Sequence, residues 1–250
     1  MAEKTNNLIR DLLPDGVITS ATRLVLVNAV YFSADWTNQF DVTMTRVDDF
    51  YLSSNTKVKV SMMQLNNKKF WHGFNRALNS NAVVLPYVNN TFSMIIVLPK
   101  LIKGLSTLES SLAADNLVNI LATGRNFKMI YSKIDVRIPK FELDLSLSLS
   151  DDLTLLGMSD LFDANADLSG IDGARDLSVT SVQHNAFIRV DEQGSQAAAA
   201  TGVGIGITAV EMPTIFAANH PFLFFIRDNS VNSIVFFGRF TNPSNTITQS

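Results

Sequence analysis

The protein is 250 residues long, with 46% hydrophobic and 17% charged residues and a formal net charge of −3. This balance excludes intrinsic disorder, which needs low hydrophobicity and high net charge, and the acidic pI of about 5.6 gives no electrostatic basis for binding nucleic acid. The absence of cysteine excludes disulfides, thiolate catalysis and cysteine-ligated zinc.

The first hundred residues are dominated by segments typical of β-strands. Residues 24–32 (LVLVNAVYF) form an apolar run with a single polar residue, Asn28, which predicts a strand buried on both faces. Asn89-Asn90 separates two later segments and favours a tight hairpin. The further strands predicted in this part of the chain are 50–52, 57–63, 68–74, 82–88 and 92–98.

Two later windows have the periodicity of helices. Residues 105–122 repeat apolar residues at a spacing close to 3.6, and residues 151–162 begin with Asp151 and Asp152, which suit a helix N-terminus. Because the other segments are strand-like and hairpins recur, we expect an α+β fold with mixed β-sheets and few helices, rather than a doubly wound parallel sheet. The strands predicted in this part are 134–145, 177–190, 222–226 and 234–240.

The sequence predicts no metal or cofactor site. The three histidines lie far apart, and isolated histidines are more often structural than catalytic. Asp163, Asn165 and Asp167 have the spacing of a calcium loop, but Leu168 and Ala174 occupy the positions where such a loop needs Gly and Glu.

The segment 191–210 (DEQGSQAAAATGVGIGITAV) combines the pattern of a strand with a composition that does not favour one. From residue 195 onward the odd positions change from small to bulky and apolar, while the even positions stay small, so the two sets would form opposite faces of a strand. Four consecutive alanines prefer a helix, and three spaced glycines weaken any regular structure. We therefore expect a segment with two states, loop and strand. The alternative from composition alone is a flexible linker.

Short motifs along the chain resemble the serpins, the serine protease inhibitor family. Residues 191–201 (DEQGSQAAAAT) resemble the hinge of an inhibitory reactive-centre loop, and residues 219–224 (NHPFLF) and 237–243 (FGRFTNP) resemble the two C-terminal signatures. Residues 26–36, from LVNAVYF to Trp36, resemble the central strand of the family's main sheet and its exit. The resemblance extends in the right order over essentially all of the chain.

The resemblance implies one partial serpin domain over residues 1–250, with a serpin-like α+β fold and an exposed reactive-centre loop at about 192–212. The chain would begin about one third of the way into the family's domain, so its N-terminal helices and the first strands of the main sheet would be missing. Strands without neighbours expose edges and apolar faces. An inactive truncated fragment is therefore an alternative to an active inhibitor.

For function, the resemblance implies a suicide-substrate inhibitor of serine proteases rather than an enzyme. In this family the protease cleaves the reactive-centre loop, and the cut loop then inserts into the main sheet as a new strand. Counting from the hinge glycine places the scissile bond at Thr208–Ala209, with Ile207–Thr208 and Val210–Glu211 as open alternatives. The implied hinge residues are Gly194, Ser195, Gln196, Ala197, Ala198, Ala199, Ala200 and Thr201.

The loop also indicates the class of target. No Arg or Lys lies between Gln193 and Met212, so a trypsin-like target, whose pocket binds a basic residue, is not expected. An elastase-like protease, or another that accepts small or aliphatic residues, is favoured. A non-inhibitory serpin acting as a carrier, chaperone or storage protein is the main alternative, but such proteins tend to carry bulky or charged residues where this chain has Ala197–Ala200. A plain β-rich binding module is a third class, which only the family motifs exclude.

Two polar sites match positions that control strand insertion in the family. Asn28 and His184 match the pair called the shutter, and we expect His184 to be buried and hydrogen-bonded towards Asn28. Lys140 and Glu192 match an ion pair of the region called the breach, near Trp36. If exposed, such a pair contributes only about 0–1 kcal/mol to stability, so its expected role is gating.

The expected partner is the target protease alone, without nucleic acid, membrane or heparin. The longest uncharged stretch, residues 193–210, is rich in Ala and Gly and does not match a membrane span, and no basic cluster supports heparin-type activation. Asn89-Asn90-Thr91 is a glycosylation sequon at a predicted hairpin tip. Because the resemblance is to a family whose members are commonly secreted, we expect an extracellular, secreted protein.

Overall fold

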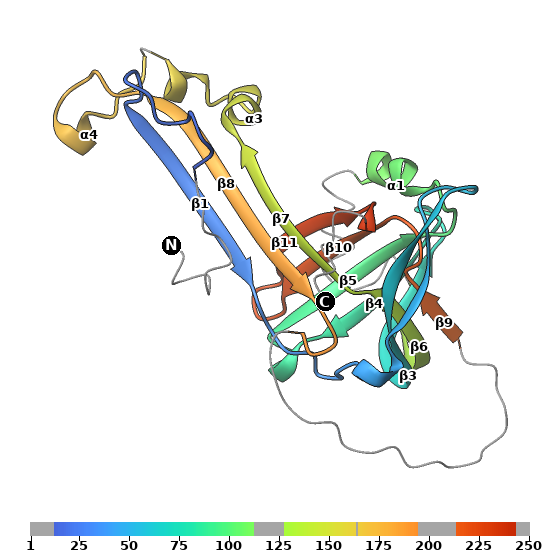
Figure 1. The fold of residues 1–250 in the computed structure, drawn as a ribbon. Helices are drawn as coiled ribbons and strands as arrows, with labels where there is room; N and C mark the ends of the chain where they lie inside the picture. The colour runs from blue at the N-terminus through green and yellow to red at the C-terminus, as the bar shows by residue number, and fades with distance from the viewer. Residues whose placement is uncertain (1–12, 113–127, 164, 195–213, 244–250) are drawn as a thin grey trace, which may run out of the picture. The chain divides into compact units, whose positions relative to one another are not determined.

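The computed structural model describes residues 13–112, 128–163, 165–194 and 214–243. The chain divides into two compact units, residues 1–32 with 142–189 and residues 33–141 with 190–250. Each unit is built on one β-sheet, and the described helices are few and short, so the fold is α+β as predicted (Figure 1). None of the described helices is both long and apolar enough to cross a membrane.

The first unit contains a three-stranded sheet. Strand β1 (Leu24–Phe32) pairs in parallel with β8 (Val179–Val190), and β7 (Phe141–Ser148) lies on the other side of β8 (Figure 1). From Val25 opposite Ser181 to Phe32 opposite Ile188, β1 and β8 stay in register without a bulge. The connection from β7 to β8 contains α3 (Ser150–Leu155), the 3-10 turn η5 (Ser159–Phe162) and α4 (Ser169–Asp172).

The prediction that the first strand is buried on both faces is wrong. None of the nine residues of β1 is buried, and Leu26 and Val27 are 41% and 37% exposed. Within the described part of the chain, β1 is an outer strand with β8 as its one neighbour. Burial depends on the layers that cover a strand, so an apolar composition alone does not establish it.

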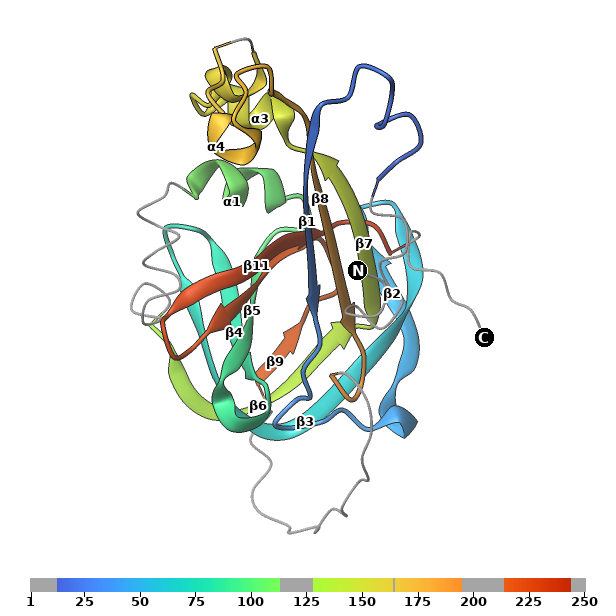
Figure 2. The same cartoon turned by 90° about the vertical axis from the view of Figure 1, so that its left-hand side faces the viewer.

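The second unit contains an eight-stranded sheet with the order β11-β10-β5-β4-β3-β6-β9, in which β2 also pairs with β3 (Figure 2). Every pair is antiparallel except β6 with β9. The strands are β2 (Arg46–Tyr51), β3 (Lys57–Asn75), β4 (Ser80–Pro86), β5 (Phe92–Pro99), β6 (Ile130–Pro139), β9 (Thr214–Ala217), β10 (Phe222–Asp228) and β11 (Ser233–Phe240). The 3-10 turns η2 (Val42–Met44) and η3 (Val88–Asn90) belong to the same unit.

The structure divides some predicted strands differently. The predicted strands 57–63 and 68–74 are one 19-residue strand, β3, with a register shift between Leu65 and Lys68. The predicted strand 134–145 is two strands, β6 and β7. The break falls at Lys140, although its backbone N–H still donates to the Ser61 carbonyl, one register position beyond the pair of Met62 and Pro139.

Both predicted helices are shorter in the structure. Helix α1 (Leu105–Ser111) packs Leu105 and Leu108 on the sheet of the second unit, and residues 113–122 of the predicted helix lie outside the described residues. The predicted helix 151–162 is interrupted at Gly157, whose φ of 98° is a conformation that only glycine adopts readily. The sheet residues packed against α1 are Ala82, Ile95, Val97, Leu223 and Phe225.

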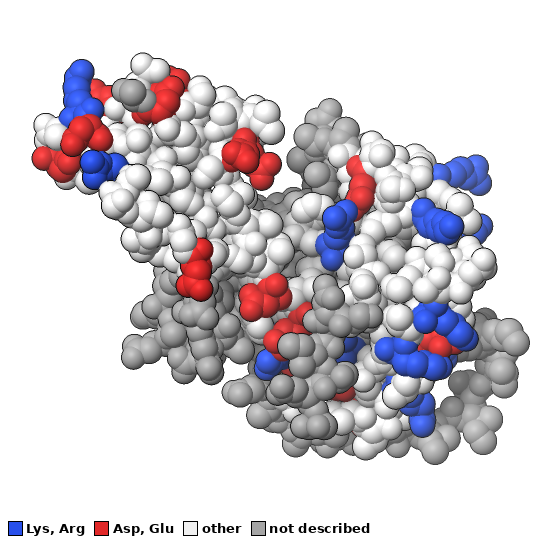
Figure 3. Space-filling view, turned by 45° about the horizontal axis from the view of Figure 1, so that its top comes forward, with Lys and Arg blue, Asp and Glu red and all other residues white. Residues whose placement is uncertain are grey.

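Charged side chains of both signs are interspersed on the face of the molecule seen in Figure 3. On neighbouring strands of the second unit, Asp49 on β2 forms two ion pairs, 2.6 Å from Lys57 Nζ and 2.7 Å from Lys59 Nζ on β3. Both lysines are more than half exposed, so these ion pairs contribute little to stability.

Candidate functional site

The chain leaving β8 is anchored by hydrogen bonds to residues near Trp36. The Trp36 indole Nε1 donates to the Asp191 carbonyl (2.9 Å), and the Trp36 backbone N–H donates to the Gln193 carbonyl (3.0 Å). The Phe40 backbone N–H donates to the Glu192 carbonyl (2.8 Å). Residues 191–194, which we call the loop root, are therefore held at three successive carbonyls.

A carboxylate turns the chain within the loop root. Asp191 Oδ1 accepts from the backbone N–H of Gln193 (3.1 Å) and of Gly194 (3.0 Å), as an aspartate-capped turn requires. Gly194 has a φ of 99°, and a Cβ there would lie 2.6 Å from Trp36 N and 2.7 Å from Asp35 Cα. Only glycine fits this position, both in backbone conformation and in space.

Glu192 is the most buried acidic group of the loop root, with 5% of its surface exposed. Its Oε2 accepts from Lys140 Nζ (2.9 Å), and its Oε1 accepts from Thr45 Oγ1 (2.8 Å). Burial by itself would raise the pKa of the carboxyl, but the hydrogen bonds from Lys140, its own backbone N–H and Thr45 outweigh burial and hold the pKa below its usual range. Glu192 is therefore ionised and fully engaged at neutral pH.

Trp36 connects the loop root to the sheet of the second unit. It is 2% exposed and stacks on Tyr87, with ring centroids 4.2 Å apart and an interplanar angle of 13°. Phe40 meets the indole edge-on at 6.2 Å. Burial, with a smaller effect from the Asp191 charge, raises the pKa of Tyr87 well above its usual range, so its hydroxyl stays neutral. Packing against these rings makes the Trp36 indole N–H a rigid, buried donor to the Asp191 carbonyl.

The structure thus brings together the residues predicted for the breach, Trp36, Lys140 and Glu192. Sequence reasoning missed Thr45, which lies 147 residues before its partner Glu192 and carries no motif of its own. It also missed the role of Asp191 as the turn-forming carboxylate, although an Asp two or three residues before a Gly is a recognisable turn signal.

The two residues predicted for the shutter lie opposite each other but are not buried. Asn28 on β1 is the register partner of His184 on β8, as strand pairing places them. Asn28 is exposed and His184 is half-buried, and among the residues that the structure describes no side-chain hydrogen bond joins them. The prediction of a buried, hydrogen-bonded His184 is wrong, because β1 is an outer strand of the described sheet.

The buried polar residues of β8 are on its other face. Ser181, Gln183 and Asn185 alternate along the strand with at most 9% exposure, and sequence reasoning missed them although their spacing of two was visible. Gln183 Nε2 donates to Ser181 Oγ (2.7 Å), and Ser146 Oγ on β7 donates to Asn185 Oδ1 (2.8 Å). The second bond joins β7 to β8.

Several predicted site residues lie outside the described residues. These are the hinge residues 195–201 and the predicted scissile pair, Thr208 and Ala209. The described flanks are the loop root at Gly194 and β9, which begins at Thr214. Within the described residues, no group of three or more His, Asp or Glu side chains is placed to hold a metal ion.

The comparisons with known proteins agree with this arrangement. The family model described as "Serpin (serine protease inhibitor)" matches residues 1–243. Human Serpin B3 is 39% identical over 241 residues, covering 96% of this chain and 61% of its own length. The pig leukocyte elastase inhibitor is 40% identical over 246 residues, covering 96% and 64%. The crystal structure of uncleaved ovalbumin is 30% identical with a TM-score of 0.86, covering 97% and 63%. The chain thus spans a little over three fifths of these relatives.

Proposed function

The chain belongs to the serpin family, and we propose that it inhibits a serine protease by suicide-substrate trapping. In this proposal residues 195–213 belong to the reactive-centre loop that the protease cleaves. The observation that carries the proposal is the anchored loop root. Trp36 and Phe40 donate hydrogen bonds to three carbonyls of residues 191–194. These bonds fix the position from which the reactive-centre loop begins. We propose residues 1–250 as one partial serpin domain.

The β1–β8 pairing supports the second step of this mechanism. β1 and β8 pair directly, with Asn28 opposite His184, so a new strand between them would have to separate this pair. A strand of about 14 residues at about 3.3 Å each spans roughly 45 Å, enough to carry an attached protease from one end of a sheet to the other. New ladder hydrogen bonds and the burial of Val203, Ile205 and Ile207 would drive insertion.

The chemistry requires only the protease and the loop. The protease serine attacks the Thr208 carbonyl, the bond to Ala209 breaks, and the amine of Ala209 leaves with a proton. The acyl-enzyme ester then persists if insertion is faster than its hydrolysis. We propose an elastase-like target because residues 194–211 contain no Arg or Lys. Relatives named leukocyte elastase inhibitor, 40% identical, are consistent with this.

We propose gating roles for the two polar sites. The Lys140–Glu192 pair and Trp36 hold the loop root, so breaking them would ease entry of residue 195 and those that follow. Asn28 and His184 face each other across the strands that must part. Both roles concern the rate of insertion.

Secretion is part of the proposal, and the sequon supports it. Asn89 is exposed in the 3-10 turn η3 between β4 and β5, where its side chain is accessible to a glycosyltransferase. Expression through a secretory pathway should add a glycan that an N-glycosidase removes and that Asn89→Gln abolishes. An unmodified chain in the medium would contradict the use of this sequon.

Incubation with pancreatic elastase, followed by a denaturing gel, tests the main proposal. A band at the summed mass of inhibitor and protease is expected, and it should disappear with an active-site serine mutant of the protease. Complete cleavage without that band would favour a non-inhibitory serpin or an inactive fragment.

A further inference from the structure

An aromatic contact joins the two strands that the proposed mechanism must separate. Tyr31 on β1 and Phe187 on β8 are register partners, and their ring centroids lie 5.9 Å apart at an interplanar angle of 38°. Phe187 is 2% exposed and Tyr31 is half-buried, so much of the contact is shielded from water. Aromatic pairs attract each other beyond the effect of the surface they bury. The contact therefore adds to the backbone hydrogen bonds that hold β1 against β8.

The aromatic pair differs from its neighbours along the β1–β8 boundary, which we call the seam. Tyr31 and Phe187 each lie three residues after Asn28 and His184, so they belong to the opposite face of the sheet. On the Tyr31 face the other register pairs join a small or aliphatic residue to a polar one, and such pairs are not among those that stabilise a sheet. These pairs are Val25 with Ser181, Val27 with Gln183 and Ala29 with Asn185.

Phe187 is also held from its own side of the seam. The Arg189 guanidinium lies over the Phe187 ring, with Cζ 5.8 Å from the ring centroid. Arg189 Nε donates to Glu142 Oε2 on β7 (2.7 Å), and Arg189 Nη2 lies 2.7 Å from the same oxygen. Strand β7 pairs with β8 on the side away from β1 (Figure 1). These contacts can stay intact when the seam opens, whereas the contact with Tyr31 must break.

The aromatic pair lies at the end of the seam where insertion would begin. Tyr31 is the second-last residue of β1, and β8 continues for three residues beyond Phe187 before the loop root. The first residue proposed to insert, Ser195, follows the loop root in the chain. Neighbouring strands lie about 4.8 Å apart, so a strand between β1 and β8 would increase their separation to about 9.6 Å. The ring contact could not survive that separation.

We propose that Tyr31 and Phe187 form a latch that sets the rate of strand insertion, by holding the seam closed at the end where the loop enters. The inference rests on the proposed trapping mechanism, because it concerns the step in which the cut loop joins the sheet. It assigns this role to a pair on the face opposite to Asn28 and His184. Loss of the ring contact should therefore speed insertion.

The test measures uptake of a synthetic peptide with the sequence of residues 195–208 and a fluorophore at its N-terminus. The peptide stands in for the cut loop, so the measurement needs no protease, and native gel electrophoresis follows the bound fluorescence over time. Tyr31→Leu should take up the peptide about threefold to tenfold faster than the parent, because the ring contact no longer opposes opening. Tyr31→Phe keeps a ring at this position and should match the parent.

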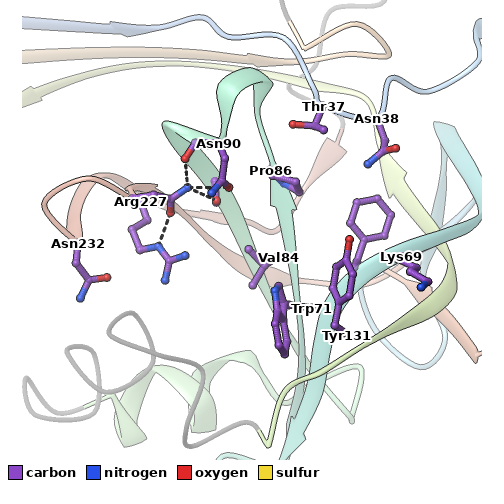
Figure 4. Close-up of a pocket in the computed structure, with 13 residues that line it drawn as sticks. Thr37, Asn38, Lys69, Trp71, Val84, Pro86, Asn90, Tyr131, Arg227 and Asn232 are labelled. Atoms are coloured by element: carbon purple, nitrogen blue, oxygen red, sulfur yellow. Dashed lines mark hydrogen bonds between the residues drawn. The ribbon is translucent and has the colours of Figure 1, made fainter.

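The matched control makes the same substitution in a ring pair away from the seam. Tyr131 on β6 and Trp71 on β3 are register partners with ring centroids 5.3 Å apart at 42°, and both line the pocket drawn in Figure 4. Tyr131→Leu should lose a comparable contact and leave peptide uptake unchanged. Equal acceleration in Tyr131→Leu and Tyr31→Leu would overturn the latch, because general destabilisation would then explain both.

Incubation of the same proteins with elastase distinguishes this inference from the proposed function. If the parent forms the covalent complex but Tyr31→Leu takes up the peptide no faster, the latch is wrong and the trapping mechanism stands. If Tyr31→Leu takes up the peptide faster but neither protein forms the complex, the latch stands and trapping is wrong. Absence of uptake by parent and variant alike would overturn the latch. If Tyr31→Leu does not fold, Tyr31→Ile replaces it with the same expectation, since a β-branched side chain suits a strand.

Discussion

The indole Nε1 of Trp36 donates a 2.9 Å hydrogen bond to the backbone carbonyl of Asp191, which lies 155 residues later in the chain. Because Trp36 is 2% exposed and stacked on Tyr87, the bond is protected from water and rigid at the donor. It joins the loop root to Trp36, and both belong to the second unit.

Replacing Gly194 by alanine should lower the free energy of unfolding by at least about 2 kcal/mol. The change combines an unfavourable left-handed backbone with a Cβ inside contact distance of Asp35 and Trp36. Substitutions at two other glycines distinguish the cost of the left-handed backbone from the cost of the steric contact. Gly173→Ala, with φ of 86° and open space, should cost about 1 kcal/mol, and helical Gly170→Ala should be neutral or stabilising. Denaturant unfolding measures all three. Equal costs at 173 and 194 would contradict the steric part.

Replacing Trp36 by phenylalanine should cost about 1–3 kcal/mol. The variant keeps a ring against Tyr87 but loses the donor to Asp191, which leaves a part-buried carbonyl without that bond. Trp71→Phe is the control, because that ring is half exposed and its change should be within about 0.5 kcal/mol. Equal shifts in melting temperature for the two variants would rule out the anchor.

Glu192 should make stability depend on pH in the acid range. Its pKa is lowered in the folded protein, so its stabilisation is complete above the unfolded value of about 4.5 and is lost as pH falls through the lower folded value. Glu192→Gln should remove this contribution and cost about 1–3 kcal/mol at pH 7. Glu142→Gln, at an ion pair exposed on both sides, is the control with little expected change. Urea unfolding from pH 7 to acid measures both, and parallel pH profiles for the parent and Glu192→Gln would be the contrary result.

Elastase should cut the chain within residues 207–211, with Thr208–Ala209 as the expected bond. The expectation rests on the distance from Gly194 and the lack of basic residues in the segment. Mass spectrometry of the released C-terminal peptide identifies the bond, and a cut outside this window would show that the register is wrong.

Ser195→Arg should convert the inhibitor into a substrate, while Gln196→Arg should have much less effect. Residue 195 begins the face predicted to enter the sheet, where an unpaired charge costs several kcal/mol, and residue 196 belongs to the other face. A barrier higher by about 2.7 kcal/mol slows insertion about a hundredfold, so hydrolysis of the acyl-enzyme wins. The ratio of covalent complex to cleaved product distinguishes the variants. Equal damage from both would refute the face assignment.

Local patterns were sufficient for most of the strands. Residues 24–32 and 92–98 match β1 and β5 within one residue, because side-chain alternation and turn residues act over a few positions. The four-residue strand β9 was missed, since so short a segment carries no periodicity, and its parallel pairing with β6 joins residues about eighty positions apart.

By itself the sequence determined the family and the α+β class, since these depend on motifs and on periodicity read along one segment. Only the tertiary structure decided that Glu192 is held by Thr45 as well as Lys140, and that Asn28 is exposed. The physical reason is that hydrogen-bond partners and burial are set by segments distant in the chain. Strand β1 has the composition of a buried strand. It is nevertheless exposed, because burial depends on neighbouring strands and covering layers, and β8 is its one neighbour in the described sheet.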